Sequence, residues 1–352
     1  MANIQFRGVG ISSMAGAVPK RVIKNLEYTQ HFPADQVKEI VEKTGIYERR
    51  FTDENTTSSD LCYAAAEKLF SDNNIDRNEI DLLLFISQTP DYRMPATSFL
   101  LQDRLKLSSN TIALDINLGC SAFIYGLSVA YSLMQQSNLR KALVLDGETR
   151  SKVYSPKDRN TAFLFGDAGV AALIERNEKY GDSWFSMNSD GSRHDLIMIP
   201  AGGYRKISSK ETVTEKVVDE YGNIRSEEHG YMNGADVFNF VIREVPNDFK
   251  NILQFSQKSV DQIDYFVFHQ ANIYMNNYLV KKLKLDPQKV PSTISKFGNT
   301  SSVSVPITII SELRDKIDQP KTLLLSAFGV GMSWASAVLT LNECKISEIV
   351  EV

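Results

Sequence analysis

Residues 111–123 of the chain, TIALDINLGCSAF, join an apolar run to a helical pattern through a short turn. The apolar run is typical of a buried strand, Gly119 and Cys120 occupy the turn, and an amphipathic helical pattern begins at Ser121. Residues 290–303, VPSTISKFGNTSSV, repeat this arrangement with a glycine and an asparagine in the turn. Strands that alternate with helices in this way predict a protein of the α/β class.

The repeat extends beyond these two turns. Asn299 follows Cys120 by 179 residues, and the apolar run that opens at Ile263 follows a similar run at Ile80 by 183. A repeat of this length indicates a duplicated domain, because the repeating units of solenoid proteins are much shorter.

We place the division near the middle of the chain. Residues 1–180 carry Cys120, and residues 181–352 carry His269 and Asn299. A chain of 352 residues is long enough for two domains. No linker-like segment separates the halves, so we expect them to pack as one body.

The composition is that of a soluble globular protein, with 43% hydrophobic residues, 23% charged residues and a net charge of −4. The negative balance argues against general binding of nucleic acid. No apolar run is long enough to span a membrane, and the N-terminus lacks a signal-peptide profile, so we expect a cytoplasmic protein that does not bind membranes. Three scattered cysteines favour a reducing compartment. The four histidines show no metal-ligand spacing with them, so no metal or cofactor is predicted.

The secondary structure follows from the periodicity. The predicted strands are Ile4–Ile11, Leu82–Ser87, Thr111–Ile116, Lys141–Asp146, Ala168–Glu175, Phe185–Asn188, Tyr265–His269, Leu323–Ala327 and Trp334–Leu341. The predicted helices are Asp35–Thr44, Ser58–Ser71, Ala96–Leu105, Ser121–Gln136, Ala235–Ser256, Asn272–Leu283 and Ser302–Ile317. Pro246 should break or kink the helix that contains it. Residues 202–230 lack a sustained period and are either a solvated surface excursion or a cap over an active-site entrance.

Cys120 is a candidate nucleophile. The partial positive charge and free N–H groups of a helix N-terminus stabilise a thiolate, and the thiolate is the form that attacks a thioester. The alternative is a small buried residue, which is what a free cysteine usually is. Cys62 and Cys344 lack this setting and are predicted to be structural.

His269 and Asn299 are candidate partners of Cys120. His269 ends an apolar run, at the edge where α/β sheets present functional groups, whereas the first copy of the run has Ser87 in that place. Asn299 stands where Cys120 stands in the other half. The alternatives are a core imidazole bonded to backbone and an ordinary helix cap. Equivalent loops of two related halves would bring the three residues together.

Several longer motifs in this order extend the pattern. They are Gly119-Cys120-Ser121-Ala122-Phe123, Phe165-Gly166-Asp167-Ala168-Gly169, His269-Gln270-Ala271-Asn272, Gly298-Asn299-Thr300-Ser301-Ser302 and Ala327-Phe328-Gly329-Val330-Gly331. With them the chain resembles the 3-oxoacyl-(acyl-carrier-protein) synthase III family, also called beta-ketoacyl-ACP synthase III, of thiolase-fold condensing enzymes. The resemblance implies an α/β protein of thiolase-like fold, a doubled body of five layers, α/β/α/β/α, that is usually a homodimer. It also implies a catalytic triad of Cys120, His269 and Asn299.

The resemblance further implies an acyltransferase that condenses an acyl thioester primer with malonyl-acyl-carrier protein, with loss of CO₂ and through an acyl-cysteine, as in the initiation of fatty-acid synthesis. Backbone N–H groups of Cys120 and Val330 would form an oxyanion hole. The residues expected to bind substrate are Arg159, Asn272, Phe328 and Gly329.

Docking of the acidic carrier protein is expected at three basic residues, Lys281, Lys282 and Arg243. The alternative for such residues is a solvated helix face. The chain departs from the family at two positions. Tyr274 stands where other members usually have an arginine, and Glu39 stands where well-known members have a tryptophan that stacks on the adenine of coenzyme A. The primer is therefore either an acyl-CoA or an acyl-ACP. Met94 is expected near the subunit interface.

Two alternatives to condensation stay open at this point. A related acyltransferase would use the same acyl-cysteine but deliver the acyl group to another nucleophile, in a specialised lipid, polysaccharide or secondary-metabolite pathway. A non-catalytic subunit would keep only the fold. The presence of Cys120, His269 and Asn299 argues against the second alternative.

Overall fold

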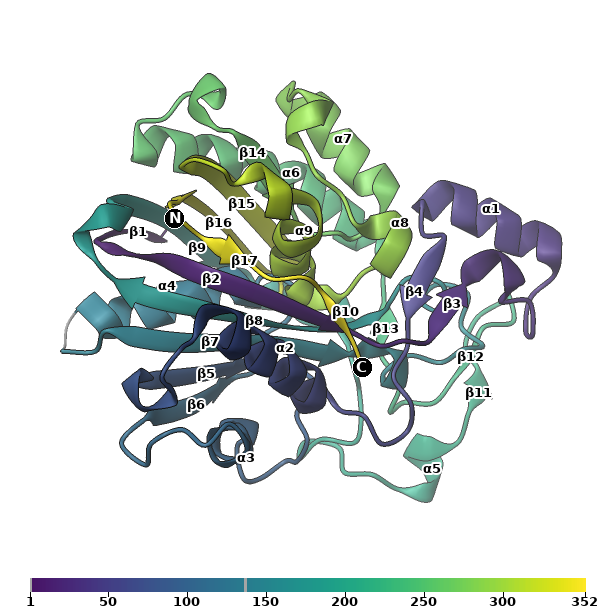
Figure 1. Cartoon of the computed structure of the whole chain (residues 1–352). Helices are drawn as coiled ribbons and strands as arrows, with labels where there is room; N and C mark the ends of the chain where they lie inside the picture. The colour runs from purple at the N-terminus through teal and green to yellow at the C-terminus, as the bar shows by residue number, and fades with distance from the viewer. Residues whose placement is uncertain (1, 136–137) are drawn as a thin grey trace.

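Two mixed β-sheets form the framework of the protein, with helices between them and on both outer sides (Figure 1). The structure is a computed structural model that describes residues 2–135 and 138–352. The first sheet has the order β17 (Lys345–Ile346), β2 (Val9–Val18), β8 (Asp167–Arg176), β7 (Lys141–Thr149), β5 (Leu82–Ile86) and β6 (Ile112–Ile116), with β18 (Val350–Glu351) also paired to β2. The second has the order β1 (Ala2–Arg7), β9 (Asp182–Ser189), β16 (Ser333–Leu341), β15 (Lys321–Gly329) and β14 (Tyr265–Phe268).

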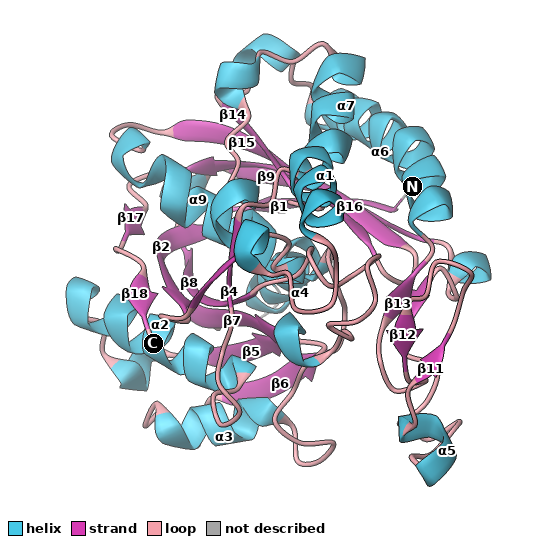
Figure 2. Ribbon diagram, turned by 90° about the vertical axis from the view of Figure 1, so that its right-hand side faces the viewer, coloured by secondary structure: helices cyan, strands magenta, loops and turns pink. Residues whose placement is uncertain are grey.

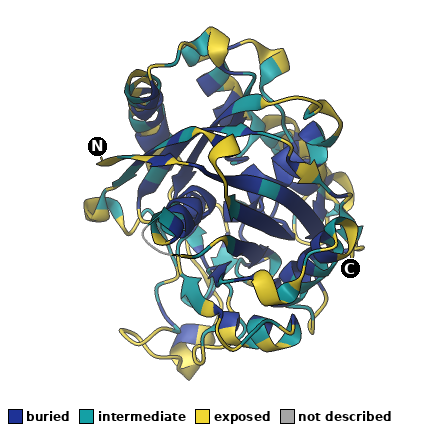
Figure 3. Ribbon diagram, turned by 60° about the vertical axis from the view of Figure 1, so that its left-hand side comes forward, coloured by how far each residue is buried: buried dark blue, intermediate teal, exposed yellow. Residues whose placement is uncertain are grey.

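Helices complete five layers. The longer helices are α1 (Ala34–Thr44), α2 (Ser58–Asn73), α3 (Thr97–Arg104), α4 (Ala122–Gln135), α6 (Gly234–Ser256), α7 (Ile273–Leu283) and α9 (Ser304–Leu313), and α5 (Lys210–Val213) and α8 (Ile294–Phe297) are single turns. One apolar core joins α4 and α9 to the inner faces of both sheets. A second core packs α2 and α3 on the outer face of the first sheet, and a third packs α6 and α7 on that of the second. The central strands of both sheets are almost entirely buried, whereas the edge strands β1 and β6 and the short β17 and β18 are partly exposed. Most other exposed residues lie on outer loops and helices (Figure 3).

The two sheets repeat one topology. The order β2–β8–β7–β5 and the order β9–β16–β15–β14 each contain two antiparallel pairings followed by a parallel one. Asp81 and Asp264 precede the parallel strands, and their carboxylates accept backbone N–H groups of Lys141 at 3.1 Å and Thr322 at 2.7 Å. The predicted duplicated α/β fold is confirmed.

These bonds refine the alignment of the halves. Because Asp81 corresponds to Asp264, counting along the strand puts Ile86, rather than Ser87, in the place of His269. The ends of the chain cross between the sheets, since β1 lies in the second sheet and β17 and β18 lie in the first. The division into residues 1–180 and 181–352 stays a prediction.

The prediction of one strand over residues 4–11 is wrong, and so is the predicted break at Pro246, whereas a kink at that residue stays a prediction. Residues 4–11 do not form one strand, because Gly8, with a φ of 66°, turns the chain from β1 in one sheet to β2 in the other. Helix α6 is not broken at Pro246 and runs for 23 residues, because buried side chains before and after the proline hold it against the second sheet.

Other element boundaries shifted by a few residues. The helix predicted over Ser302–Ile317 is divided into a 3₁₀ turn at Ser301–Val303, helix α9 and a second 3₁₀ turn. The predicted end of the helix at Gln136 lies outside the described residues. Within the described residues, no helix is both long and apolar enough to cross a membrane.

Candidate active site

The three predicted catalytic side chains line one cavity of about 80 Å³. Cys120 lies two residues before α4, His269 follows β14 directly, and Asn299 lies between α8 and the 3₁₀ turn that leads into α9. Of the other predicted site residues, Asn272, Phe328, Gly329 and Val330 also line this cavity. The strand ends and helix starts of the two halves therefore meet at one place.

Cys120 is buried at the bottom of this arrangement, with 7% of its surface exposed. Burial by itself raises the pKa of its thiol. The charge and hydrogen bond of His269 outweigh this effect, with help from the Arg150 guanidinium and the Val330 backbone N–H, and the net pKa is about 7. The thiol is thus substantially ionised near neutral pH, which is what a cysteine nucleophile needs.

The other two cysteines differ. Burial raises the pKa of Cys62 well above its ordinary value and that of Cys344 to about 12. Both are fully or almost fully buried among apolar side chains, so neither thiol ionises at neutral pH. This contrast supports the prediction that they are structural.

His269 is oriented by its neighbours. Its Nδ1 lies 2.7 Å from the hydroxyl of Ser304, and that hydroxyl oxygen also accepts the backbone N–H of Gln270 at 3.3 Å. When the hydroxyl donates to Nδ1, the hydrogen of a neutral imidazole is on Nε2. The ring meets Phe328 edge to face, with centroids 5.4 Å apart.

Asn299 is held by both its backbone and its side chain. Its N–H donates to Leu164 at 2.9 Å, and its carbonyl accepts the N–H of Gly166 at 3.1 Å. Its side-chain Oδ1 accepts the N–H of Ser301 at 2.9 Å. Because the acceptor end of the amide is occupied, the donor Nδ2 is the group that remains for a ligand.

Two glycines allow the close approach of the halves. A Cβ added at Gly329 would lie 2.5 Å from the Cys120 sulfur, and one added at Gly119 would lie 2.0 Å from the Val330 side chain. The hydroxyls of Ser121 and Ser333 lie 2.8 Å apart across the same contact, and Ser333 donates to the Val330 carbonyl at 2.9 Å. These contacts bring the Val330 N–H to the sulfur.

Arg159 and the predicted docking residues do not line the cavity. The backbone N–H of Arg159 donates to Asn223 at 2.8 Å, and its guanidinium lies 5.5 Å from the ring centre of Tyr221. Lys281 and Lys282 are exposed at the end of α7, and Arg243 is exposed on α6 with an ion pair to Glu244 at 2.7 Å. The roles assigned to these four residues stay predictions.

The segment 202–230 has a mixed character. Helix α5 and the hairpin of β11 (Lys216–Val217) and β12 (Ile224–Arg225) lie at the periphery of the molecule (Figure 2). Strand β12 is bonded to the neighbouring loop, because Ile224 donates to Lys157 at 3.1 Å and accepts from Ser155 at 2.7 Å. The end of the segment returns to the cavity wall, where a Cβ at Gly230 would lie 2.6 Å from the Tyr154 ring. Most of the segment is a surface excursion, and only its last residues contact the site.

Three residues that the sequence reasoning missed contribute to the site. Ser304 orients the imidazole, and Arg150 and Tyr154 line the cavity. Ser304 had a signal, since it lies five residues after Asn299 at the start of the helix that follows. Nothing in the sequence marked Arg150 as a site residue, because an arginine after a strand ordinarily faces water.

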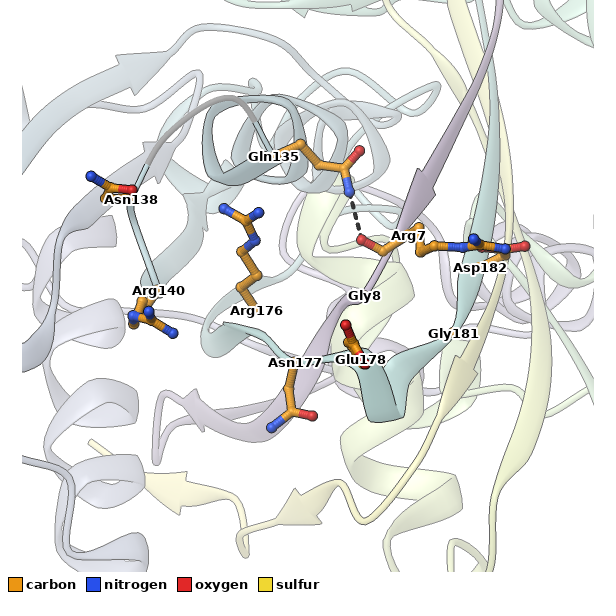
Figure 4. A pocket seen from close by; sticks show the side chains of 10 residues that line it. All are labelled: Arg7, Gly8, Gln135, Asn138, Arg140, Arg176, Asn177, Glu178, Gly181 and Asp182. Carbon is orange, nitrogen blue, oxygen red and sulfur yellow. Dashed lines mark hydrogen bonds and ion pairs between the residues drawn. The ribbon is translucent and has the colours of Figure 1, made fainter.

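A larger hollow, of about 1050 Å³, is not this site. Arg7, Arg140 and Arg176 surround it, and Gln135 donates to the Arg7 carbonyl (Figure 4). Arg140 precedes the start of β7 and Arg150 follows its end, so the hollow and the cavity lie roughly 30 Å apart along the strand. Among the described residues, no cysteine, serine or histidine lines the hollow.

Metal chemistry has no visible basis in the described residues. Residues 2–135 and 138–352 contain no group of three or more histidine, cysteine, aspartate or glutamate side chains that could hold a metal ion. The residues around Cys120 instead supply a thiol, an imidazole, an amide and backbone donors. A duplicated five-layered body with these groups at one cavity defines a thiolase-fold condensing enzyme.

Comparisons with known proteins agree with this class. Two family models match, 3-oxoacyl-[acyl-carrier-protein (ACP)] synthase III over residues 114–191 and its C-terminal part over residues 253–341. A beta-ketoacyl-[acyl-carrier-protein] synthase III of Clostridioides difficile is 34% identical over 331 residues, which cover 94% of this chain and 97% of the relative. The crystal structure of a 3-oxoacyl-(acyl-carrier protein) synthase of Burkholderia xenovorans superimposes with a TM-score of 0.94 at 36% identity, over 100% of this chain and 99% of the other.

The chain belongs to the 3-oxoacyl-(acyl-carrier-protein) synthase III family, as its motifs predicted, and it is an acyltransferase. A structure of Xanthomonas campestris OleA, at 22% identity and a TM-score of 0.79 over 96% of this chain and 99% of that one, shares the fold alone.

Proposed function

We propose that the chain condenses an acyl thioester primer with malonyl-acyl-carrier protein, through an acyl group carried on Cys120, as in the initiation of fatty-acid synthesis. The observation that carries this proposal is the cavity shared by Cys120, His269 and Asn299, in which the thiol pKa is about 7. Relatives named for the same reaction support it.

The first step forms the acyl-cysteine. The Cys120 thiolate attacks the carbonyl carbon of the primer, and the backbone N–H groups of Cys120 and Val330 stabilise the oxyanion. The bond from that carbon to the carrier sulfur then breaks. The protonated His269 gives its proton to the leaving thiolate, so a free carrier thiol, an acyl-cysteine and a neutral imidazole remain.

The second step is the condensation. A malonyl thioester enters and its carboxylate leaves as CO₂, while the electron pair of the broken carbon–carbon bond forms an enolate. Nε2–H of His269 and Nδ2–H of Asn299 donate to the enolate oxygen. The enolate carbon attacks the acyl carbonyl, the Cys120 thiolate leaves, and a proton from water returns to His269.

We propose that the carrier protein docks on α6 and α7, the helices that border the cavity. Asn272 at the start of α7 lines the cavity, and Lys281 and Lys282 lie at the other end of that helix. Arg243 lies on α6, whose Phe238 packs against aromatic rings of α7. An acidic carrier bound across these helices would stand above the cavity, with Arg159 contacting the primer carrier, a coenzyme A or a second carrier protein.

The proposal includes a homodimer formed through β6. This strand is the last in its sheet and no described strand pairs with its outer edge. Ile112 on β6 is 45% exposed, and Phe99 on α3 and Met94 before that helix are 52% and 77% exposed. The start of α3 bonds β6, because Thr97 and Ser98 donate their N–H groups to Asp115 at 2.7 and 2.8 Å. Apolar side chains along an unpaired edge favour pairing with a second copy. The three cysteines are free thiols, which favours the reducing cytoplasm as the compartment.

The test is an intact-mass experiment on the purified protein. Acetyl- or butyryl-thioesters of coenzyme A and of carrier protein are added, and the acylated peptide is mapped. We expect the acyl mass on Cys120, followed by its loss, with release of CO₂, when malonyl-carrier protein is added. An acyl-enzyme that transfers its acyl group without decarboxylating malonate would contradict the condensation.

A further inference from the structure

Arg150 is a buried cation beside the nucleophile that the proposed mechanism does not use. It is 5% exposed and lines the cavity together with Cys120. It lies directly after β7, at the start of a 3₁₀ turn that leads to Tyr154, another residue of the cavity wall. Most of the remaining lining is apolar, so a guanidinium here needs a reason.

The polar partners of Arg150 within the protein are few and distant, and its guanidinium also lies 5.8 and 5.9 Å from the ring centres of Tyr154 and Phe165. Nη1 lies 3.9 Å from a Glu148 carboxylate oxygen, and Nη2 lies 3.4 Å from Oε1 of Gln88. The Nε–H has no hydrogen-bond partner although it is buried. Both Glu148 oxygens already accept closer donors, from Gln88 at 3.1 Å and Thr89 at 2.9 Å. The guanidinium therefore keeps unused donor capacity in a place with little exposure to water.

A side pocket of about 300 Å³ adjoins the cavity at this residue. It shares Arg150, Tyr154, Ile197 and Val330 with the cavity. Its own lining adds two amides, Gln88 and Asn117, to the Arg150 guanidinium. A plain hydrocarbon chain that grew from Cys120 into this pocket would cover these polar groups without pairing them.

Acylation of Cys120 increases the need of Arg150 for an acceptor. In the free protein the thiolate is a negative neighbour of Arg150, and the guanidinium favours that ionised form. Once the sulfur carries an acyl group it is neutral, and Arg150 loses this neighbour. An oxygen acceptor on the acyl chain would replace it.

We propose that the primer is a short acyl chain carrying an oxygen acceptor, a carboxylate foremost, and that Arg150 recognises this oxygen from the side pocket. This inference rests on the proposed function, because the acyl group must reach Cys120. It names a substrate class that differs from unsubstituted acyl primers.

The test compares primers of equal length. Succinyl, 3-hydroxybutyryl and butyryl groups each have four carbons, and their pantetheine thioesters avoid the question of the carrier. The rate of acylation of Cys120 is followed by intact mass in the wild type, in Arg150→Met and in Arg150→Lys. Lys152→Met is the matched control, since Lys152 lies in the same 3₁₀ turn but bonds the exposed carbonyls of Glu54 and Thr56.

We expect the wild type to prefer succinyl or 3-hydroxybutyryl over butyryl by roughly 10- to 100-fold, the range for a hydrogen bond to a charged group. Arg150→Met should remove this preference, Arg150→Lys should keep part of it, and Lys152→Met should leave it unchanged. The ratio of two primers is insensitive to the thiol pKa, because both react with the same thiolate. Thermal unfolding of each variant checks that it folds.

Two results would overturn the inference. An equal rate for butyryl and the oxygenated primers, or a preference that survives in Arg150→Met, means that Arg150 does not select the primer. In both cases Cys120 is still acylated, and the proposed function stands. If no primer acylates Cys120, the proposed function fails together with this inference.

Discussion

The two halves use the same crossing from strand to helix for different purposes. In the first half α4 begins two residues after Cys120, whereas in the second half α9 begins five residues after Asn299. The early helix start places a thiol at a helix N-terminus. The late start inserts a 3₁₀ turn whose N–H at Ser301 occupies the oxygen of the Asn299 amide.

The strand ends differ in the same way. In the first half β5 ends at Ile86, whose side chain is buried in the apolar core. In the second half His269 lies at the equivalent position, directly after β14. A duplicated scaffold thus supplies a nucleophile from one copy and hydrogen-bond donors from the other. Neither copy contains a complete site, which teaches that the chemistry depends on how the halves meet.

The largest effect is expected from the first half. Cys120→Ala should lower the condensation rate by roughly 10⁴-fold or more, because no other group can carry the acyl chain. Condensation is measured with a malonyl-carrier substrate. Cys344→Ala is the control, since its thiol pKa is about 12 and it should keep its activity. Full activity of Cys120→Ala would end the covalent mechanism.

The second half is tested by splitting the reaction. Asn299→Ala should slow decarboxylation of malonyl thioester by roughly 10²- to 10³-fold, the usual cost of one oxyanion donor. Acylation of Cys120, which does not form the enolate, should change far less. The two rates are measured on the same preparation. Equal losses in both steps would show that Asn299 acts on the fold of the site rather than on the enolate.

The contact between the halves is tested by pH. The rate of alkylation of Cys120 by iodoacetamide should rise with pH around a midpoint of about 7, because the thiolate is the reactive form. His269→Ala should move the midpoint upward, since His269 is the main group that lowers the thiol pKa. Each unit of this shift costs about tenfold of the thiolate at neutral pH. An unchanged midpoint would assign the ionisation to other groups.

A smaller effect is expected at Ser304, a positioning residue. Ser304→Ala should lower the condensation rate by about 2- to 12-fold, the equivalent of one ordinary hydrogen bond. Ser304→Thr keeps the hydroxyl and should restore most of the rate. Rescue distinguishes the role, because Ser304→Thr can again bond Nδ1 through its hydroxyl, whereas a packing defect would not be repaired by the added methyl group.

The smallest effect concerns Asp146, a buried acid within β7. Burial raises its pKa well above the ordinary value. The folded protein holds this proton more tightly than the unfolded chain, so stability falls as pH rises from the unfolded pKa toward the folded one. Asp146→Asn, which resembles the protonated acid, should remove that loss.

We expect Asp146→Asn to unfold like the wild type near pH 4 and to be more stable by about 1 kcal/mol near pH 8. Urea unfolding at both pH values measures the difference. Oδ1 accepts the Ser302 hydroxyl at 2.6 Å in the wild type and can do so in the variant, so loss of this hydrogen bond does not contribute to the difference. A destabilised variant at pH 8 would mean that Asp146 is ionised in the fold.

Much of the fold was predictable because the relevant signals are local. Buried strands such as β5 and β7 read as apolar runs, and the helix of Cys120 showed its apolar face in the sequence. The predictions failed where a distant contact overrides the local pattern. Gly8 sends one apolar run into two sheets, and packing carries α6 through Pro246.

The sequence by itself determined the α/β class, the duplication, the family and three candidate side chains, because these follow from periodicity, spacing and motif. Tertiary structure alone decided that the three side chains share a cavity, that Val330 reaches the sulfur across Gly329, and that Arg150 lies inside. The physical reason is range. Periodicity reports on neighbours along the chain, whereas a pKa and a partnerless N–H depend on atoms that only folding brings together.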